Sequence, residues 1–427
     1  MRIILAAMLC CLSLGAQAKE RVITKEQLVD KVEGFWMGQM LGNYIGFPFE
    51  NLYIDEAIPL LVDRVFTADY DGSPELMINR TDHRGHIPFV TATVRGAFSD
   101  DDTDIEFVTL HAVERYGLDI TYPEITEAWM THINDFIWVA NREARNLMDK
   151  GFVAPDTGRK ENNKHWFQID PQLVNEIWSA FYPGMVEQAT ERALWGARIT
   201  NDDWGTHPTI AYGAMISAAF FESDVNKLMK IAVKSVPRKG PFAEGMRDVI
   251  RWHKKHDDWR TTRQLIHDKY YAYKRGSVEA PVSVVSSLVN GLTGMMAILY
   301  GEGDYLKTVG IATSAGYDCD NQAATTGGLI GVLRGMSGIG EEAVELMTTM
   351  PKWYDWDKPF NDMYVNMTRD EIALRTPISE MVRRTVAVAE EAIRSNGGRM
   401  ELRDGEIVLS LIHISEPTRR TPISYAV

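Results

Sequence analysis

Cysteine is scarce in this chain of 427 residues, which has only three. Two of them, Cys10 and Cys11, lie in an N-terminal apolar run that we expect to be removed, so that only Cys319 remains. A single cysteine forms no intramolecular disulfide, even in an oxidising compartment. Cysteine and histidine also show no spacing typical of zinc ligands. The stability of the fold must therefore come from packing or from bound ions.

The chain also lacks an excess of positive charge: 45 lysines and arginines against 59 aspartates and glutamates give a net charge of −14. It has no basic footprint for nucleic acid and no attraction to an anionic membrane surface. Beyond the N-terminus, no apolar stretch reaches the roughly 18 residues that span a bilayer. A hydrophobic fraction of 45% excludes a disordered chain. We therefore predict a globular protein with no nucleic-acid partner and no stable membrane association.

The N-terminal residues 1–18 have the features of a secretory signal peptide. Arg2 provides a positive start, residues 3–14 form an apolar run too short for a membrane span, and residues 16–18 have the small-x-small cleavage pattern. The alternative interpretation is a buried N-terminal helix. We predict cleavage after Ala18 and a periplasmic or secreted protein.

Near the C-terminus, a β-strand pattern is followed by a segment of a different sequence character. Residues 399–408 alternate between apolar and polar types around Asp404 and Gly405, which predicts the start of a β-hairpin. Residues 409–427 look like translated adapter DNA, so we predict a non-native tail; the alternative is a genuine polar tail. A hairpin that starts at such a break suggests a truncated β segment.

Between the ends, residues 19–398 have the pattern of one large, mostly helical domain, and we predict an all-α fold class with the hairpin at its end. Apolar residues recur at three and four positions in helices predicted at 24–40, 105–116, 187–198, 209–221, 242–253, 282–300, 320–333 and 378–394. The best strand-like run is Leu60–Phe66. Residues 68–90 and 150–170 are rich in loop-forming types and predict long loops.

A first motif is a series of glycines spaced by four, at Gly34, Gly38, Gly42 and Gly46. Each glycine costs about 1 kcal/mol against alanine inside a helix, so close packing or ligand binding is expected there. Glu50 follows after Pro48, on a loop. The alternative is a tight helix crossing with a solvated Glu50.

A second motif is an acidic run that leads into a helix, with Asp100, Asp101, Asp102 and Asp104. Two carboxylates about 4 Å apart repel by roughly 4 kcal/mol at an effective dielectric constant near 20. Such a run therefore requires water or a cation among its side chains. The alternative is that Asp102 caps the helix and the other carboxylates face water.

A third motif places Asp318, Asp320 and Asn321 where a loop enters a glycine-spaced helix. Two carboxylates separated by one residue cannot share a helix face, but both can point at one ion from a loop. Ligation by oxygen alone suits a hard cation, with Mg²⁺ first and Mn²⁺ or Ca²⁺ next. The alternative is an ordinary capped helix.

Together, the order and wide spacing of these motifs resemble the ADP-ribosylglycohydrolase family, which includes the dinitrogenase-reductase-activating glycohydrolase. The resemblance covers roughly residues 25–395 and rests on the segments 42–50, 101–103 and 316–320. It implies a single all-α domain with two Mg²⁺ ions in a central cleft. In that family the metals orient the substrate ribose hydroxyls and a water molecule.

Carried onto this sequence, the resemblance assigns roles to particular residues. It implies metal ligation by Asp100, Asp101, Asp102, Asp318, Asp320 and Asn321, catalysis by Glu50 and Asp101, and substrate binding by His207, Gly46 and Asn43. Thr103 fixes this register, whereas a slipped register gives Ser99, Asp100 and Asp101, so that Asp101 belongs to both. For His207, a histidine that caps a core helix is an equal alternative.

The sequence departs from the family pattern at three positions. Asp100 replaces a hydroxyl residue, Asn321 replaces the usual threonine, and Asn43 replaces the common aspartate after Gly42. We expect an exported, Mg²⁺-dependent hydrolase that cleaves a ribosyl N- or O-glycosidic bond in a small-molecule or protein-linked glycoside. The alternatives are a metal-independent helical glycosidase with two carboxylates and a non-catalytic protein that binds an ADP-ribose-type ligand.

Overall fold

The structure is a computed structural model and describes residues 20–66, 76–79, 95–99, 101–271, 274–275, 278–279, 283–349, 356–403 and 406–411. Several sequence predictions lie outside these residues: the signal peptide at 1–18, Asp100, most of the expected loop 68–90, and the tail from 412 onward.

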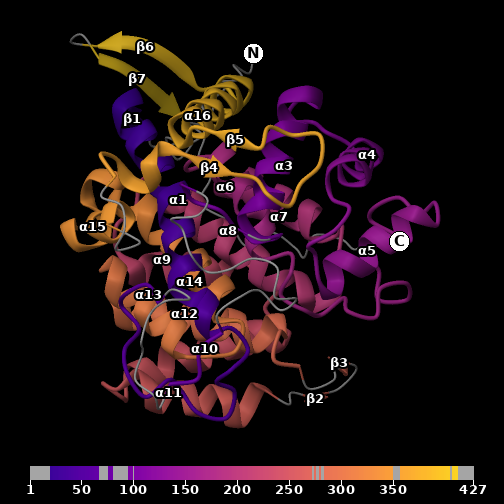
Figure 1. The fold of residues 1–427 in the computed structure, drawn as a ribbon, viewed down its shortest axis with the longest axis vertical. Helices are drawn as coiled ribbons and strands as arrows, with labels where there is room; N and C mark the ends of the chain where they lie inside the picture. The colour runs from indigo at the N-terminus through magenta and orange to yellow at the C-terminus, as the bar shows by residue number, and fades with distance from the viewer. Residues whose placement is uncertain are drawn as a thin grey trace, which may run out of the picture.

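Helices dominate the described residues, as the sequence predicted (Figure 1). They are α1 (Lys25–Gly46), α3 (Asp101–Tyr116), α4 (Tyr122–His132), α5 (Val139–Asp149), α6 (Ile177–Phe181), α7 (Val186–Ala197), α8 (His207–Ala219), α9 (Val225–Ser235), α10 (Pro241–His253), α11 (Trp259–Ile266), α12 (Ser287–Gly301), α13 (Tyr305–Ser314), α14 (Cys319–Arg334), α15 (Glu341–Thr349) and α16 (Ile378–Ser395). Short 3₁₀ turns include η1 (Phe47–Phe49), η2 (Leu173–Asn175), η3 (Asp203–Thr206), η5 (Met336–Gly338) and η6 (Pro359–Asp362), and η4 (His267–Tyr271) is a π-helical turn.

The centre of the domain is the pair formed by α1 and α14, which share the most extensive contact between elements (Figure 1). Their glycines face each other across the contact. A methyl group on Gly38 would lie 2.3 Å from the carbonyl oxygen of Gly327, and one on Gly42 would lie 2.2 Å from that of Ala323. The glycine series is therefore a packing seam. It continues beyond the predicted end of the helix at residue 40, because α1 extends to Gly46.

A small sheet lies at one end of the helical domain, with the strand order β1 (Arg21–Thr24), β7 (Glu406–Leu411), β6 (Arg399–Arg403) (Figure 1). The predicted hairpin is confirmed as β6 and β7, and β1 pairs with β7 so that Ile23 lies opposite Leu409. Strand β7 continues three residues past 408, to Leu411. Residues 409–411 thus belong to the sheet, whereas the origin of the remaining tail stays a prediction.

The predicted strand at Leu60–Phe66 is wrong, because that segment forms no strand. Its side chains Val62 and Phe66 are buried, which accounts for the apolar pattern. However, the backbone N–H of Val62 donates to the Ser314 hydroxyl at 2.9 Å, so the segment packs on α13 instead of pairing with another strand. Among the described residues, the remaining strands are the short pairs β2 (Lys274–Arg275) with β3 (Val278–Glu279) and β4 (Tyr364–Val365) with β5 (Arg375–Thr376).

The loop expected at residues 150–170 is confirmed and is well anchored. The side-chain amide of Asn163 donates to the carbonyl oxygens of Ala140, Thr157 and Thr200 at 3.0–3.2 Å. Ile169 donates its backbone N–H to Val285 at 2.9 Å, which holds the end of the loop beside the start of α12. Within the described part of the chain, every helix is too short or too polar to cross a membrane.

Candidate metal centre

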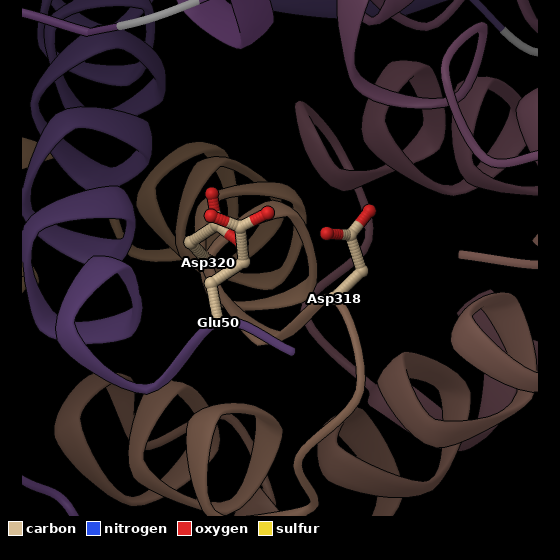
Figure 2. Close-up of side chains that lie close together, drawn as sticks. All are labelled: Glu50, Asp318 and Asp320. Carbon is tan, nitrogen blue, oxygen red and sulfur yellow. The ribbon is translucent and has the colours of Figure 1, made fainter. Parts of the chain in front are cut away.

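Three carboxylates from two distant parts of the chain meet at the junction of α1 and α14 (Figure 2). Glu50 follows η1, Asp318 directly precedes α14 without a side-chain capping hydrogen bond, and Asp320 lies in the first turn of that helix. One oxygen from each lies within 4.8 Å of the others. Asp318 and Asp320 are buried and Glu50 is half-buried. The predicted convergence of Glu50, Asp318 and Asp320 is thus present.

The packing seam brings these side chains together. Gly46 lies so close to α14 that a methyl group there would stand 2.2 Å from the Cα atom of Asp320. The Cys319 thiol donates to the Gly46 carbonyl oxygen at 3.6 Å. Gly46, predicted to bind substrate, therefore packs against the backbone that carries Asp320.

Backbone hydrogen bonds tie the loop of Glu50 to the loop of Asp318. Asn51 donates its N–H to the carbonyl oxygen of Tyr317 at 2.8 Å, and Tyr317 donates to Tyr53 at 2.9 Å. Tyr317 has a φ of 63°, a left-handed conformation that costs about 1–3 kcal/mol for a bulky residue. The Asp318 N–H donates to the Asn290 side-chain oxygen at 3.1 Å. These contacts fix the direction in which Asp318 leaves the loop.

Asp101 approaches the centre from the start of α3. Its Oδ2 atom accepts a hydrogen bond of 2.9 Å from the Asn141 side chain. The backbone N–H of Asn141 donates to Asp170 Oδ1 at 3.0 Å, so Asn141 joins the two carboxylates. Asp101 and Asp170 both act electrostatically on Asp318. Asp101, predicted as catalytic and metal-ligating, therefore lies near the cluster, together with a fourth aspartate.

The mutual repulsion and burial of these acids favour their neutral forms in the absence of a cation. Burial raises the pKa of Asp318 well above its usual range, and the charge of Glu50 adds to this effect. Burial likewise raises the pKa of Asp170 to about 8. Burial also raises the pKa of Asp101, although Arg369 opposes the rise. A bound cation would stabilise all of them as carboxylates.

Asp102 lies beside this group but has different partners. Its Oδ2 atom accepts from the Asn43 amide at 3.2 Å, and its Oδ1 atom accepts from the Asn321 amide at 3.1 Å. Asn43 in turn accepts from the Ser99 hydroxyl at 3.3 Å. The two asparagines that depart from the family pattern therefore both bind Asp102. The ligand roles predicted for Asp102 and Asn321, and the substrate role predicted for Asn43, stay predictions.

Asp104, in the first turn of α3, belongs to a buried polar cluster. It accepts hydrogen bonds from Tyr364 and Thr368 and lies 3.5 Å from the Arg369 guanidinium. Burial raises the pKa of Asp104 to about 7, and Arg369 opposes the rise. Arg369 thus brings a buried positive charge close to Asp101 and Asp104.

His207 begins α8 and is buried. Its ring packs beside Gly240, and neither ring nitrogen has a hydrogen-bond partner among the described residues. Burial lowers the pKa of His207 to about 4, with Asp203 acting in the opposite direction. Within the described part of the chain, no hydrogen bond or ion pair joins His207 to the carboxylates. Its substrate role stays a prediction.

Three residues of this centre were missed from the sequence: Asn141, Asp170 and Asn290. Asn141 lies in the first turn of α5, a helix that was not among those predicted, and Asp170 lies at the end of the long loop. Asp170 followed by Pro171 was a weak signal for an ordered turn after the loop. Their position beside Asp101 depends on tertiary contacts that a local pattern does not encode.

The donor set fits a hard divalent cation. The three side chains that converge, Glu50, Asp318 and Asp320, offer oxygen atoms only, as Mg²⁺ and Mn²⁺ prefer. Asp101 and Asp170, which act electrostatically on Asp318, add further carboxylates nearby. The Oδ2 atom of Asp170 is buried without a hydrogen-bond partner among the described residues. Such an atom costs about 1–3 kcal/mol unless a donor or cation compensates it.

Comparisons with known proteins bear on the fold and on the family. Among solved structures, the chain is similar to one described as an ADP-ribosylglycohydrolase-related protein complex, with a TM-score of 0.50 and 14% identity over 86% of this chain and 99% of that chain. At this identity the likeness shows the fold alone. No curated protein has significant sequence similarity to the chain. The family model described as ADP-ribosylglycohydrolase matches residues 24–372, and the chain therefore belongs to the ADP-ribosylglycohydrolase family.

Proposed function

We propose that this protein is an exported, Mg²⁺-dependent hydrolase that cleaves a ribosyl N- or O-glycosidic bond. Family membership supports a glycohydrolase. The single observation that carries the metal dependence is the meeting of Glu50, Asp318 and Asp320, whose oxygens lie within 4.8 Å of one another. The signal-like pattern of residues 1–18 supports export to the periplasm or the medium.

In this proposal the acidic side chains hold the cations and Glu50 handles the proton. Asp101, Asp318 and Asp320 would be ligands, with Mn²⁺ as a possible replacement for Mg²⁺. The bound cations would supply positive charge that orients the ribose hydroxyls and makes a nearby water a better nucleophile. Glu50 is half-buried, accepts from the Asn51 amide at 3.0 Å and lies at the edge of the cluster, where its carboxylate would take a proton from water.

The direct test is release of ADP-ribose from ADP-ribosyl-arginine by the purified protein, with and without a chelator. We expect release that stops in EDTA and returns on addition of Mg²⁺ or Mn²⁺. The Glu50→Gln variant should bind the substrate but turn it over at least 100-fold more slowly, within the roughly 100- to 10,000-fold contribution of a general base. Activity on oligosaccharides that is insensitive to chelator would instead support a metal-independent glycosidase with two carboxylates.

The contacts of Asp102 favour one further candidate, a non-catalytic protein that binds an ADP-ribose-type ligand. Both oxygens of Asp102 accept amide hydrogen bonds, from Asn43 and Asn321, at the position of an expected metal ligand. Isothermal titration that shows ADP-ribose binding, combined with no turnover of any ribosyl glycoside in Mg²⁺, would support this second function over the first.

A further inference from the structure

Arg263, on the buried face of α11, has an uncommon environment for a charged side chain. It is 1% exposed, yet no carboxylate forms an ion pair with it among the described residues. Its guanidinium group bonds to carbonyl oxygens instead: Nε donates to Ala315 at 3.0 Å, and the two Nη atoms donate to Asp55, at 2.8 Å, and to Ile54. Burying a charge is costly, and an apolar side chain of similar volume often packs at least as well. The presence of a buried arginine here therefore calls for a reason other than packing.

The carbonyl oxygens that Arg263 engages belong to the two loops that form the candidate metal centre. Two of them follow Glu50 along one loop, and that of Ala315 precedes Asp318 in the other. Arg263 comes from a third part of the chain and joins the two loops. A guanidinium group presents its donors in a fixed planar fork, so it bonds to both loops at once only when they lie at one particular separation.

Arg263 also contacts the residue directly before Asp318. Its guanidinium carbon lies 4.6 Å from the centre of the Tyr317 ring, a cation–π contact. His267, four residues after Arg263, stacks on the same ring, and its Nδ1 atom lies 2.6 Å from the tyrosine hydroxyl oxygen. Tyr317 has a left-handed backbone conformation, with a φ of 63°. A bulky residue keeps such a conformation only when its surroundings enforce it, and Arg263 and His267 are two of the groups that do so.

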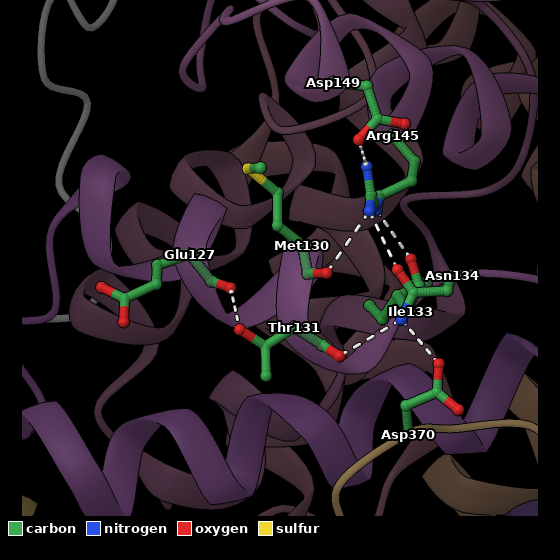
Figure 3. A network of polar contacts seen from close by, with 8 residues as sticks. All are labelled: Glu127, Met130, Thr131, Ile133, Asn134, Arg145, Asp149 and Asp370. Atoms are coloured by element: carbon green, nitrogen blue, oxygen red, sulfur yellow. Dashed lines mark hydrogen bonds and ion pairs between the residues drawn. The ribbon is translucent and has the colours of Figure 1, made fainter.

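Arg145 on α5 shows the more usual environment of an arginine that ties two segments together. It donates to the carbonyl oxygens of Ile133 at 2.8 Å and of Met130 at 3.3 Å, and it also forms an ion pair with Asp149 (Figure 3). The Asp149 side chain is 60% exposed, so a solvated carboxylate balances the charge of Arg145. Arg263 has no such compensation, so its bonds to the two loops are the reason that we see for its place in the core.

The geometry of Arg263 explains its role better than its charge does. The charges that act most strongly on Asp318 are those of Glu50, Asp170 and Asp101. The charges that act on Arg263 come mainly from side chains outside this cluster. Arg263 therefore acts on the centre through the backbone of the two loops.

We propose that Arg263 is a positioning residue for the candidate metal centre, which holds the loop of Glu50 against the loop of Asp318 and so sets the distance at which their carboxylates meet. Their nearest oxygens lie within 4.8 Å of each other in this arrangement. Metal sites require ligand distances within about 0.2 Å of their ideal values, so a small separation of the loops would weaken cation binding. The inference rests on the proposed metal-dependent function and adds to it a residue that has no ligand atom of its own.

Mn²⁺ binding followed by electron paramagnetic resonance tests this role without any substrate, on the full chain well below its melting temperature. We expect Arg263→Gln to lower the affinity for Mn²⁺ about 10- to 100-fold, as the loss of a group that orients ligands does, and to change the line shape of the bound ion. The matched control is Arg260→Gln. Arg260 lies on the same helix and donates to the Ile58 carbonyl oxygen at 3.4 Å, but it makes no bond to the loop of Asp318 among the described residues. This variant should keep the wild-type affinity and line shape.

The outcomes separate positioning from stability alone, and the inference from the proposed function. A role in stability alone would lower the melting temperature of Arg263→Gln in EDTA but leave the affinity and line shape of the folded variant unchanged. That result would overturn the inference, while the function stands if the wild type releases ADP-ribose. If the wild type binds no Mn²⁺, both are overturned. Should Arg263→Gln be unfolded in EDTA, Arg263→Lys provides the test, because it keeps the buried charge but not the planar fork. Wild-type affinity and line shape in that variant would contradict the inference.

Discussion

At the scale of single residues, the carboxylates that would bind a cation also lower the stability of the fold when no cation is bound. Asp318 is buried next to Glu50 and close to Asp101 and Asp170, so that in the absence of a cation its carboxylate is unfavourable. The fold keeps these side chains in place because the surrounding residues are tightly packed. Metal ligation gives a reason for retaining four like charges in one place.

Asp318→Asn should therefore lower function and raise stability. We expect Mn²⁺ affinity and hydrolysis to fall at least as far as the roughly 10- to 100-fold cost of losing an outer-shell partner. In EDTA, however, the variant should melt at a higher temperature than wild type, because a neutral amide replaces a buried acid. Calorimetry and Mn²⁺ titration measure the two effects. An unchanged affinity together with a lower melting temperature in EDTA would mean that Asp318 serves packing only.

His207 gives a second prediction at this scale, on pH. Burial lowers its pKa to about 4, so the folded chain binds this proton less readily than the unfolded chain does. The stability that His207 contributes is therefore full above the unfolded value near 6.5 and is lost as the pH falls toward 4. Urea unfolding should show the wild type losing more stability than His207→Gln between pH 7 and pH 5. Parallel curves for the two proteins would contradict the burial of this ring.

At the scale of elements, the sequence predicted some helices closely and missed others, among them the amphipathic helices α5, α9 and α11. The predicted segments 242–253 and 378–394 agree with α10 and α16 almost to the residue, because their apolar faces have a clear period. Helix α13 was missed since threonine, glycine and serine interrupt its buried face. Strand β1 was missed because its partner β7 lies at the far end of the chain.

The same distinction applies to the candidate centre. Glu50, Asp101, Asp318 and Asp320 were predicted because each lies in a local motif next to a helix end. Asp170 was not, since only the fold of the 150–170 loop brings it to Asp101, through Asn141. The local pattern also gave no indication that Asn43 and Asn321 would both bind Asp102.

The seam between α1 and α14 should be intolerant of any added atom. In Gly42→Ala, the new methyl group would lie 2.2 Å from the carbonyl oxygen of Ala323, so the helices must separate. We expect a loss of about 1–3 kcal/mol or more in the free energy of unfolding, as for overpacked cores, and weaker Mn²⁺ binding because Asp320 moves with α14. Gly338→Ala is the control, since that glycine is exposed and its nearest contact is 3.5 Å away. Equal stability of the two variants would contradict the seam.

Strand β7 allows a test of whether residues after 408 contribute to the stability of the folded domain. Leu409 is 0% exposed and lies beyond the boundary at 408, whereas Leu402 in the same hairpin is 73% exposed. Leu409→Ala should cost about 2–5 kcal/mol of unfolding free energy, and Leu402→Ala should cost almost nothing. Denaturant melts of the two variants decide the matter. If both substitutions are neutral, the sheet does not contribute to the folded domain.

At the scale of the whole molecule, the proposed binding of a metal at the acidic centre would couple folding to pH. Ligands must be deprotonated, so metal binding releases protons wherever the free carboxyl groups hold them. Burial raises the pKa of Asp170 to about 8 and raises that of Asp318 well above its usual range. At pH 5 a cation would therefore displace the proton of Asp170, whereas near pH 8 it would meet an Asp170 carboxyl group that is partly ionised.

We therefore expect the rise in melting temperature caused by Mg²⁺ to increase from pH 5 to pH 8. A carboxyl group whose pKa is raised in the folded state makes the metal-free chain lose stability as the pH rises. A bound cation compensates for this loss, so its stabilising effect increases with pH. Calorimetry with Mg²⁺ against EDTA, at constant ionic strength, measures the difference at each pH. Asp170→Asn should flatten the pH dependence, and Asp224→Asn, at the exposed cap of α9, should leave it unchanged. A rise in melting temperature that is equal at every pH would mean that these buried acids are already ionised without metal. Burial would then raise their pKa values less than the structure indicates.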